Sequence, residues 1–351
     1  MDKFKSTGLS LLLALSTSVS EAGNSETLSS GRVDRNVAAQ QSAGPQSLHL
    51  TTASRISEML NHPAFAGFSR LLLPWDDRSY DGEMPLDDIG SLLPYHSHVV
   101  PEVVVGALNR MIDDANSGKH VFFDFYTESQ KRADASKRHT GLLFFRGKPG
   151  APFAIIAPGG GFSYVGSVHE GFPYAVEINK QGYNAFVLKY RAGHGGDVAT
   201  QDLAAAITYI VDNAKALGVS ARDYSVWGSS AGARMVASIG SHGVAAFGGK
   251  YLAKPATVVM AYTGHSDHSA KEPPTFVVVG DRDGIAPPSI MEHRVATLTR
   301  AGTAVEYHRY PNVGHGFGIG TGTSAEGWIS DATDFWERFI VTNQEVSLPK
   351  K

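Results

Sequence analysis

The run Gly228-Ser229-Ser230-Ala231-Gly232 joins a short apolar segment to a helical pattern. It matches G-x-S-x-G, in which a nucleophilic serine stands on a sharp turn between a strand and a helix. Such a turn needs small neighbours because the strand and the helix approach each other closely, and Gly228 and Gly232 meet that need. Ser230 is therefore predicted to present its hydroxyl beside a helix N-terminus, which favours developing negative charge. The alternative is a serine that only caps a helix.

A serine hydroxyl is a weak nucleophile that needs a general base, and the base needs an orienting acid. Both residue types follow later in the chain, the acid before the histidine, each after a predicted strand. His315 lies in a glycine-flanked loop after the predicted strand 304–310, and this position selects it from 14 histidines. Asp283 and Asp281 compete for the role of the acid. Asp283 is preferred, because Asp281 directly follows its strand and is expected to cap its own turn.

A run of three glycines, residues 159–161, follows the predicted strand 153–157. Backbone N–H groups are unshielded there and can surround a substrate oxygen that becomes negatively charged. The predicted oxyanion hole takes one N–H from Ala231 and another from Gly160 or Gly161. A phosphate-binding loop is the rival interpretation. The run fits neither the G-x-x-x-x-G-K-[ST] pattern nor the G-x-G-x-x-G pattern with its downstream acid.

Three residues next to these loops are expected to contact substrate: Phe162, His169 and Ser229. His169 and its neighbour Glu170 either hydrogen-bond a polar acyl or sugar group or anchor the start of the predicted helix 171–181. Tyr164, Tyr190 and Arg191 either line the pocket or support its loops.

Two stretches contain paired histidines. The sequence HSDH at residues 265–268 fits no strong metal-ligand spacing, so we assign it to the edge of the site and predict no metal and no cofactor. The sequence HSH at residues 96–98 is expected to cap a helix or to lie at the surface.

Apolar patterns indicate the elements that must position these residues. The predicted strands are 121–126, 141–146, 153–157, 184–190, 224–227, 256–262, 275–279 and 304–310, and the predicted helices are 101–117, 171–181, 200–217, 230–241, 288–301 and 325–341. Strands that alternate with helices predict an α/β fold, whose mainly parallel sheet is covered on both faces. The first two strands are close enough in sequence to form an antiparallel hairpin.

The composition is that of an ordinary globular protein, with 42% hydrophobic and 19% charged residues in a chain of 351. The formal net charge is −3 and no basic run is present, so no nucleic-acid partner is predicted. The absence of cysteine excludes disulfides, thiolate metal sites and cysteine nucleophiles. The oligomeric state is not predicted.

The first residues resemble a signal peptide. Lys3 and Lys5 precede the apolar stretch 9–15, and small residues precede a cleavage position after Ala22. The apolar stretch is too short to span a bilayer. We therefore expect a secreted or periplasmic protein with no membrane span. The remaining division is a disordered linker at 23–50, a helical prefix at 51–119 that packs on or caps the catalytic domain, and an α/β catalytic domain at 120–345.

From about residue 121 to 341 the chain resembles the α/β-hydrolase superfamily, in particular the esterase/lipase group with its acetyl esterases and acetylxylan-type esterases. The stretches that carry the resemblance are APGGGFSYVGSVHEG (157–171), GYNAFVLKYR (182–191), DLAAAITYI (202–210), VWGSSAGARM (226–235), VVVGDRDGIAPP (277–288) and NVGHGF (312–317). The resemblance implies a triad of Ser230, Asp283 and His315 that hydrolyses esters without a cofactor. It also implies short acyl groups, acetyl first, with esters of small molecules or carbohydrates as substrates.

Two departures from the group are visible. Pro158 stands where many relatives have histidine, and Ala233-Arg234 stands where relatives often have glycine and histidine. The second departure affects the shape of the acyl pocket rather than the triad.

Two other functions remain open. A peptidase of the prolyl-oligopeptidase type shares the fold and the triad, but such enzymes usually add a large propeller domain, for which the prefix is too short. A hydrolase fold used only for binding typically lacks a triad residue, whereas every position of the triad is filled here.

Overall fold

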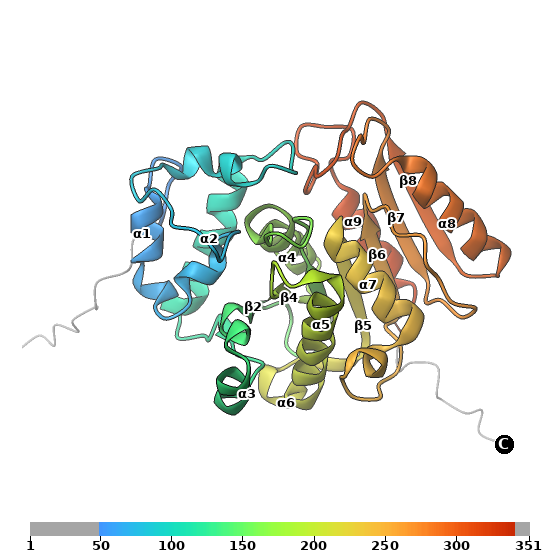
Figure 1. The fold of residues 1–351 in the computed structure, drawn as a ribbon, viewed down its shortest axis with the longest axis horizontal. Helices are drawn as coiled ribbons and strands as arrows, with labels where there is room; N and C mark the ends of the chain where they lie inside the picture. Colours follow the sequence, from blue (N-terminus) through green and yellow to red (C-terminus); the bar gives the residue numbers. More distant parts are fainter. Residues whose placement is uncertain (1–48, 341–351) are drawn as a thin grey trace, which may run out of the picture. The chain divides into compact units, whose positions relative to one another are not determined.

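One eight-stranded sheet forms the centre of the computed structural model, which describes residues 49–340 (Figure 1). The spatial order is β1-β2-β4-β3-β5-β6-β7-β8. The strands are β1 (Phe122–Phe123), β2 (Gly141–Phe145), β3 (Pro152–Ala157), β4 (Asn184–Lys189), β5 (Ser220–Ser229), β6 (Thr257–Ala261), β7 (Thr275–Gly280) and β8 (Val305–Tyr310). The pairs β1–β2 and β2–β4 are antiparallel, and all other pairs are parallel. The predicted α/β architecture is confirmed.

Both faces of the sheet are buried because side chains of each strand alternate between two hydrophobic cores. In β3, Ala154 and Ile156 face one core, and Phe153 and Ile155 face the other. Figure 1 shows α5 and α7 side by side over the middle of the sheet. The first core is covered by α2 (Pro101–Asn116), α4 (Phe172–Lys180) and α9 (Trp328–Glu337), and the second by α5 (Gly195–Asp212), α7 (Ala231–His242) and α8 (Pro288–Arg300).

Some predicted boundaries differ from the structure. The predicted helix 200–217 begins earlier and is two helices, α5 and α6 (Ala214–Leu217), which are separated by Asn213. The first two strands do pair antiparallel, but α3 (Glu128–Ala133) and a 3₁₀ turn lie between them, so they do not form a tight hairpin. Local apolar patterns do not encode such interruptions.

The helical prefix contains α1 (Ile56–Leu60), α2 and several 3₁₀ turns, and it lies beside β2 and β4 in Figure 1. Val104 and Leu108 of α2 belong to the same core as Phe172 and Ile178 of α4. A buried cation strengthens this junction: Lys189 on β4 donates to the carbonyls of residues 73 and 74. The segment therefore packs on the sheet through apolar and polar contacts.

The expected signal peptide and most of the expected linker lie outside the described residues, so these assignments and the domain boundaries stay predictions. No helix between residues 49 and 340 is both long and apolar enough to cross a lipid bilayer.

Candidate active site

Ser230 occupies the turn between β5 and α7 with a backbone conformation that L-residues rarely adopt. Its φ is 50° and its ψ is −114°. A non-glycine residue in this region is strained, and such strain is found at functional sites. The N–H of Ser230 donates to Ala261 O at 2.9 Å, which fastens the turn to the neighbouring strand β6. The turn holds the hydroxyl in a surface cleft of about 580 Å³.

The glycines of the motif allow close backbone contacts. A Cβ atom on Gly232 would lie 1.8 Å from Ala157 O, and one on Gly228 would lie 2.4 Å from Gly232 O. Both contacts are to backbone atoms, which cannot rotate away. The sharp turn therefore depends on glycine at both positions.

We expect Gly232→Ala to lower the free energy of unfolding by about 3 kcal/mol, because the added methyl group forces the strand–helix junction apart. The measurement is urea unfolding followed by circular dichroism. Gly106→Ala is the matched control, since Gly106 is on a helix and a Cβ atom there meets nothing within 4 Å. That variant should be neutral or slightly stabilised. Equal stability of the two variants would contradict this account of the turn.

Three side chains from separate loops form one hydrogen-bonded chain. His315 Nε2 lies 2.9 Å from Ser230 Oγ, and His315 Nδ1 lies 2.8 Å from Asp283 Oδ2. The carboxylate can only accept, so Nδ1 carries the proton and Nε2 is free to accept from the serine hydroxyl. Asp283 and His315 are both buried. This arrangement is the one needed to deprotonate a serine as it attacks.

The two aspartates that the sequence left open have different partners. Asp283 Oδ1 accepts from the N–H groups of Ile285 and Ala286 at 2.8 and 2.7 Å, which leaves Oδ2 directed at the histidine. Asp281 Oδ1 accepts from the N–H of Asn312 at 2.7 Å. Asp281 therefore ties the histidine loop to its strand, whereas Asp283 contacts the imidazole.

The glycine loop after β3 bends through residues with positive φ: Gly160 at 132°, Gly161 at 62° and Phe162 at 60°. Within residues 49–340, the N–H groups of Gly160, Gly161 and Ala231 donate to no protein acceptor. Ala231 is the first residue of α7, where N–H groups lack partners inside the helix. Gly161 and Ala231 line the cleft beside Ser230. These amides are free to bind an oxyanion.

The Glu170 side chain holds Gly159, at the start of this glycine loop, in place. Its Oε2 accepts from the N–H of Gly159 at 2.5 Å, and its Oε1 accepts from the Tyr262 hydroxyl at 2.8 Å. The carboxylate is fully buried, and burial alone would raise the pKa of Glu170. The neighbouring His96, whose Nε2 lies 3.0 Å from Oε1, acts with His169 and the Tyr262 hydroxyl against this effect and lowers the pKa of Glu170 to about 2. A fixed negative charge therefore anchors the loop, and Gly159 is excluded as an oxyanion donor.

Family models match two consecutive parts of the chain. The BD-FAE model matches residues 146–251, and the Prolyl oligopeptidase family model matches residues 253–342. The described residues before 146 lie outside both matches.

The chain is similar to known esterases. It is 25% identical over 212 residues to an acetylxylan esterase from Xylanibacter ruminicola, covering 51% of this chain and 44% of that protein's length. Among solved structures, an acetyl ester-xyloside bifunctional hydrolase from Caldicellulosiruptor lactoaceticus is 21% identical, with a TM-score of 0.51 over 57% of this chain and 89% of that one. The chain has the fold of this α/β-hydrolase structure. The resemblance to the esterase group is thereby confirmed. An α/β hydrolase enzyme from a Medee basin deep-sea metagenome library is 23% identical, with a TM-score of 0.49 over 57% and 92% of the two chains.

Two of the three residues that were expected to contact substrate do not line the cleft. The His169 side chain is buried, its Nε2 lies 3.0 Å from Gly316 O, and it does not line the cleft. Ser229 is fully buried, with its Oγ 3.0 Å from the Tyr174 hydroxyl. In β5 alternate side chains face opposite sides, so the residue before the nucleophile points into the core. Phe162 does line the cleft.

One residue of the cleft was not among the predicted substrate contacts, although the sequence analysis connected Ala233-Arg234 with the shape of the acyl pocket. Arg234, one helical turn after Ser230, is exposed in the cleft, and its guanidinium lies 6.0 Å from the centre of the Phe162 ring. The spacing of four residues along α7 was a usable signal, because it places both side chains on one helix face. His265 and Asp267 line the cleft as well, which agrees with the expected position of residues 265–268 at the edge of the site. No group of three or more potential metal ligands is found in the described part of the chain.

His96 and Ser97 are neither a helix cap nor surface residues, contrary to expectation. His96 is in contact with Glu170, and Ser97 Oγ donates to His315 O at 2.7 Å. His96 and Ser97 therefore reach the site from the helical prefix, whereas His98 is exposed, as expected. Of the three residues with two proposed roles, Tyr164, Tyr190 and Arg191, none lines the cleft.

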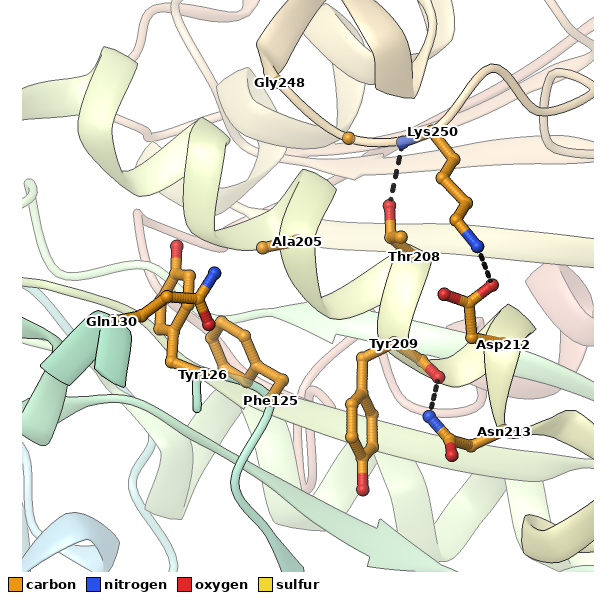
Figure 2. Close-up of a pocket in the computed structure, with 11 residues that line it drawn as sticks. Phe125, Tyr126, Gln130, Ala205, Thr208, Tyr209, Asp212, Asn213, Gly248 and Lys250 are labelled. Atoms are coloured by element: carbon orange, nitrogen blue, oxygen red, sulfur yellow. Dashed lines mark hydrogen bonds and ion pairs between the residues drawn. The ribbon is translucent and has the colours of Figure 1, made fainter. Parts of the chain in front are cut away.

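A second hollow, of about 340 Å³, lies along α5 away from the serine (Figure 2). Several of its polar groups pair with one another. Lys250 binds Asp212 through its ammonium and Thr208 through its N–H, and Asn213 donates to Tyr209 O. The hollow contains no nucleophile–base pair, so the cleft at Ser230 is the candidate site for chemistry.

Proposed function

We propose that this protein is a serine carboxylic-ester hydrolase that works through an acyl-enzyme. The single observation that carries the proposal is the hydrogen-bonded chain from Ser230 Oγ through His315 to Asp283, beside free backbone amides. The esterase relatives support the same class of reaction. Because the chain spans less than half of the acetylxylan esterase that it matches, the activity of that protein is not transferred as a whole.

The first half-reaction acylates the serine. As Ser230 Oγ attacks the ester carbonyl carbon, its proton moves to His315 Nε2 and the carbonyl oxygen becomes an oxyanion. The N–H of Ala231 and that of Gly160 or Gly161 stabilise this charge. Asp283 keeps the imidazole oriented and stabilises its positive charge. The intermediate then collapses, His315 returns the proton to the leaving alkoxide, and the alcohol departs.

The second half-reaction regenerates the enzyme. A water molecule gives a proton to His315 Nε2 while its oxygen bonds to the acyl carbon. The new oxyanion uses the same amides. When the bond to Ser230 Oγ breaks, the proton returns to the serine and the carboxylic acid leaves. Every proton transfer uses one imidazole nitrogen, so no cofactor is required by this proposal.

We further propose short acyl groups, acetyl first, on carbohydrate or small alcohols. The similarity to the acetylxylan esterase supports this choice. The cleft of about 580 Å³ is in the range of small-molecule sites. Export to the periplasm or medium, supported by the signal-like residues 1–22, would place the enzyme where polymeric esters are found.

A peptidase is the second candidate, because the prolyl oligopeptidase family model matches residues 253–342. Such a function needs a peptide-binding region around the serine in addition to the triad. The similarity to the acetylxylan esterase favours ester hydrolysis over this alternative.

The test compares p-nitrophenyl esters of increasing acyl length, acetylated xylo-oligosaccharides and a dipeptide naphthylamide. We expect turnover of the acetyl ester, a kcat/KM at least about tenfold lower for the octanoyl ester, and no cleavage of the dipeptide. Preferential cleavage of the dipeptide would replace the esterase proposal by the peptidase. No turnover of any substrate and no labelling by an organophosphonate would favour a binding protein.

A further inference from the structure

One segment of the helical prefix, residues 95–97, joins two loops of the active site. We call it the bridging segment. Ser97 Oγ donates to His315 O at 2.7 Å, and the N–H of Ser97 donates to Gly316 O at 2.9 Å. The two bonds hold consecutive carbonyls of the histidine loop. They connect positions 218 residues apart in the chain, so the prefix supplies a constraint that the loop's own sequence does not contain.

The same segment holds the glycine loop. The His96 ring lies between two groups of that loop, with Nδ1 2.9 Å from the Tyr164 hydroxyl and Nε2 3.0 Å from Glu170 Oε1. Both the His96 and the Glu170 side chains are at most 1% exposed. The N–H of Tyr95 donates to the Tyr164 hydroxyl at 3.1 Å. Glu170 in turn holds Gly159, immediately before the proposed oxyanion donors.

The histidine loop needs such support because of its composition. His315 lies between two glycines, and Gly316 has a φ of 68°, so the loop has little intrinsic rigidity. A general base must stay within hydrogen-bonding reach of its proton, and a displacement of about 1 Å can reduce the rate about a hundredfold. A Cβ atom on Gly316 would lie 2.5 Å from Tyr95 O, which shows how closely the bridging segment approaches the loop.

We propose that Ser97 is a positioning residue for His315, and that the prefix thereby completes the active site instead of only covering the sheet. The inference rests on the proposed ester hydrolysis. Ser97 reaches the reaction only through the carbonyl of His315. His96 serves the glycine loop in the same manner, through Tyr164 and Glu170. Both family models match only residues after this segment, so the bridging segment lies outside the matched region.

The test is the steady-state kinetics of Ser97→Ala on p-nitrophenyl acetate, together with the rate at which an organophosphonate labels Ser230. We expect kcat and the labelling rate to fall about tenfold with an unchanged KM, because the base is displaced while the cleft is intact. Ser97→Thr keeps the hydroxyl and should restore most of kcat. Ser97→Cys, which offers only a weak donor, should give an intermediate kcat.

Ser91→Ala is the matched control, because Ser91 is exposed in the same prefix and, among residues 49–340, its hydroxyl has one hydrogen-bond partner, the sulfur of Met84 at 3.7 Å. Its kcat should equal that of the wild type. Thermal melts of all variants separate loss of folding from loss of rate. If Ser97→Ala does not fold, Ser97→Cys replaces it as the test variant. Wild-type kcat and labelling in folded Ser97→Ala would overturn the inference while ester hydrolysis stands. A wild-type protein that neither hydrolyses nor labels would instead refute the proposed function, and this inference with it.

Discussion

Ser230→Ala is expected to lose about 10⁶-fold in kcat on p-nitrophenyl acetate, because removing the nucleophile abolishes the acyl-enzyme route. The residual rate should come only from the amides of the cleft acting on a bound ester and water. Folding should be preserved, since the serine hydroxyl makes its contact at the cleft and not in the core. The measurement is kcat at substrate saturation with a thermal melt of the same preparation.

Ser229→Ala is the matched control for this loss. Ser229 precedes the nucleophile, but its hydroxyl faces Tyr174 in the core. Ser229→Ala should lower the free energy of unfolding by about 1 kcal/mol and leave kcat unchanged. A Ser230→Ala protein with substantial esterase activity would contradict the assignment of the nucleophile.

Asp283→Asn is expected to lower kcat by about 10⁴-fold. The asparagine side chain has an NH₂ group in place of one carboxylate oxygen. It could therefore not accept from all three groups that now donate to Asp283, which are the N–H groups of Ile285 and Ala286 and the His315 ring. The wrong tautomer of His315 would then be favoured, with Nε2 protonated and unable to take the serine proton. The measurement is kcat/KM as a function of pH, on folded protein.

Asp281→Asn is the matched control for Asp283→Asn. Asp281 is only two residues from Asp283 in the sequence, but its Oδ1 accepts from the N–H of Asn312. The side-chain oxygen of an asparagine can accept the same hydrogen bond. We expect kcat within about threefold of the wild type. If Asp281→Asn lowered kcat more than Asp283→Asn does, Asp281 and not Asp283 would be the acid that orients His315.

Most of the fold and the triad geometry was predictable, for a physical reason. Strands buried on both faces are continuous apolar runs, which made the central strands visible in the sequence. The carboxyl ends of parallel strands lie at one edge of a sheet. Ser230, Asp283 and His315 each follow such a strand. Their meeting therefore follows from the order of strands β5, β7 and β8.

The rest of the site depends on contacts that sequence patterns do not contain. His96 and Ser97 follow no strand, and their partners lie far along the chain. His169 looked accessible because it follows a glycine loop, but the loop that contains Gly316 covers it. Burial, together with the nearby His96, lowers the pKa of His169 to about 4, so its ring is neutral at pH 7 and serves as a hydrogen-bonding group inside the protein.

The central claim is that the hydroxyl of Ser230, deprotonated by His315, bonds covalently to the substrate. The most direct measurement is mass spectrometry of peptides from protein inactivated by an organophosphonate. The account predicts one adduct, on the peptide that contains Ser230, formed in proportion to the loss of esterase activity and absent from His315→Ala treated for the same time. An adduct on another residue that tracks the loss of activity, or unimpaired labelling without His315, would contradict it.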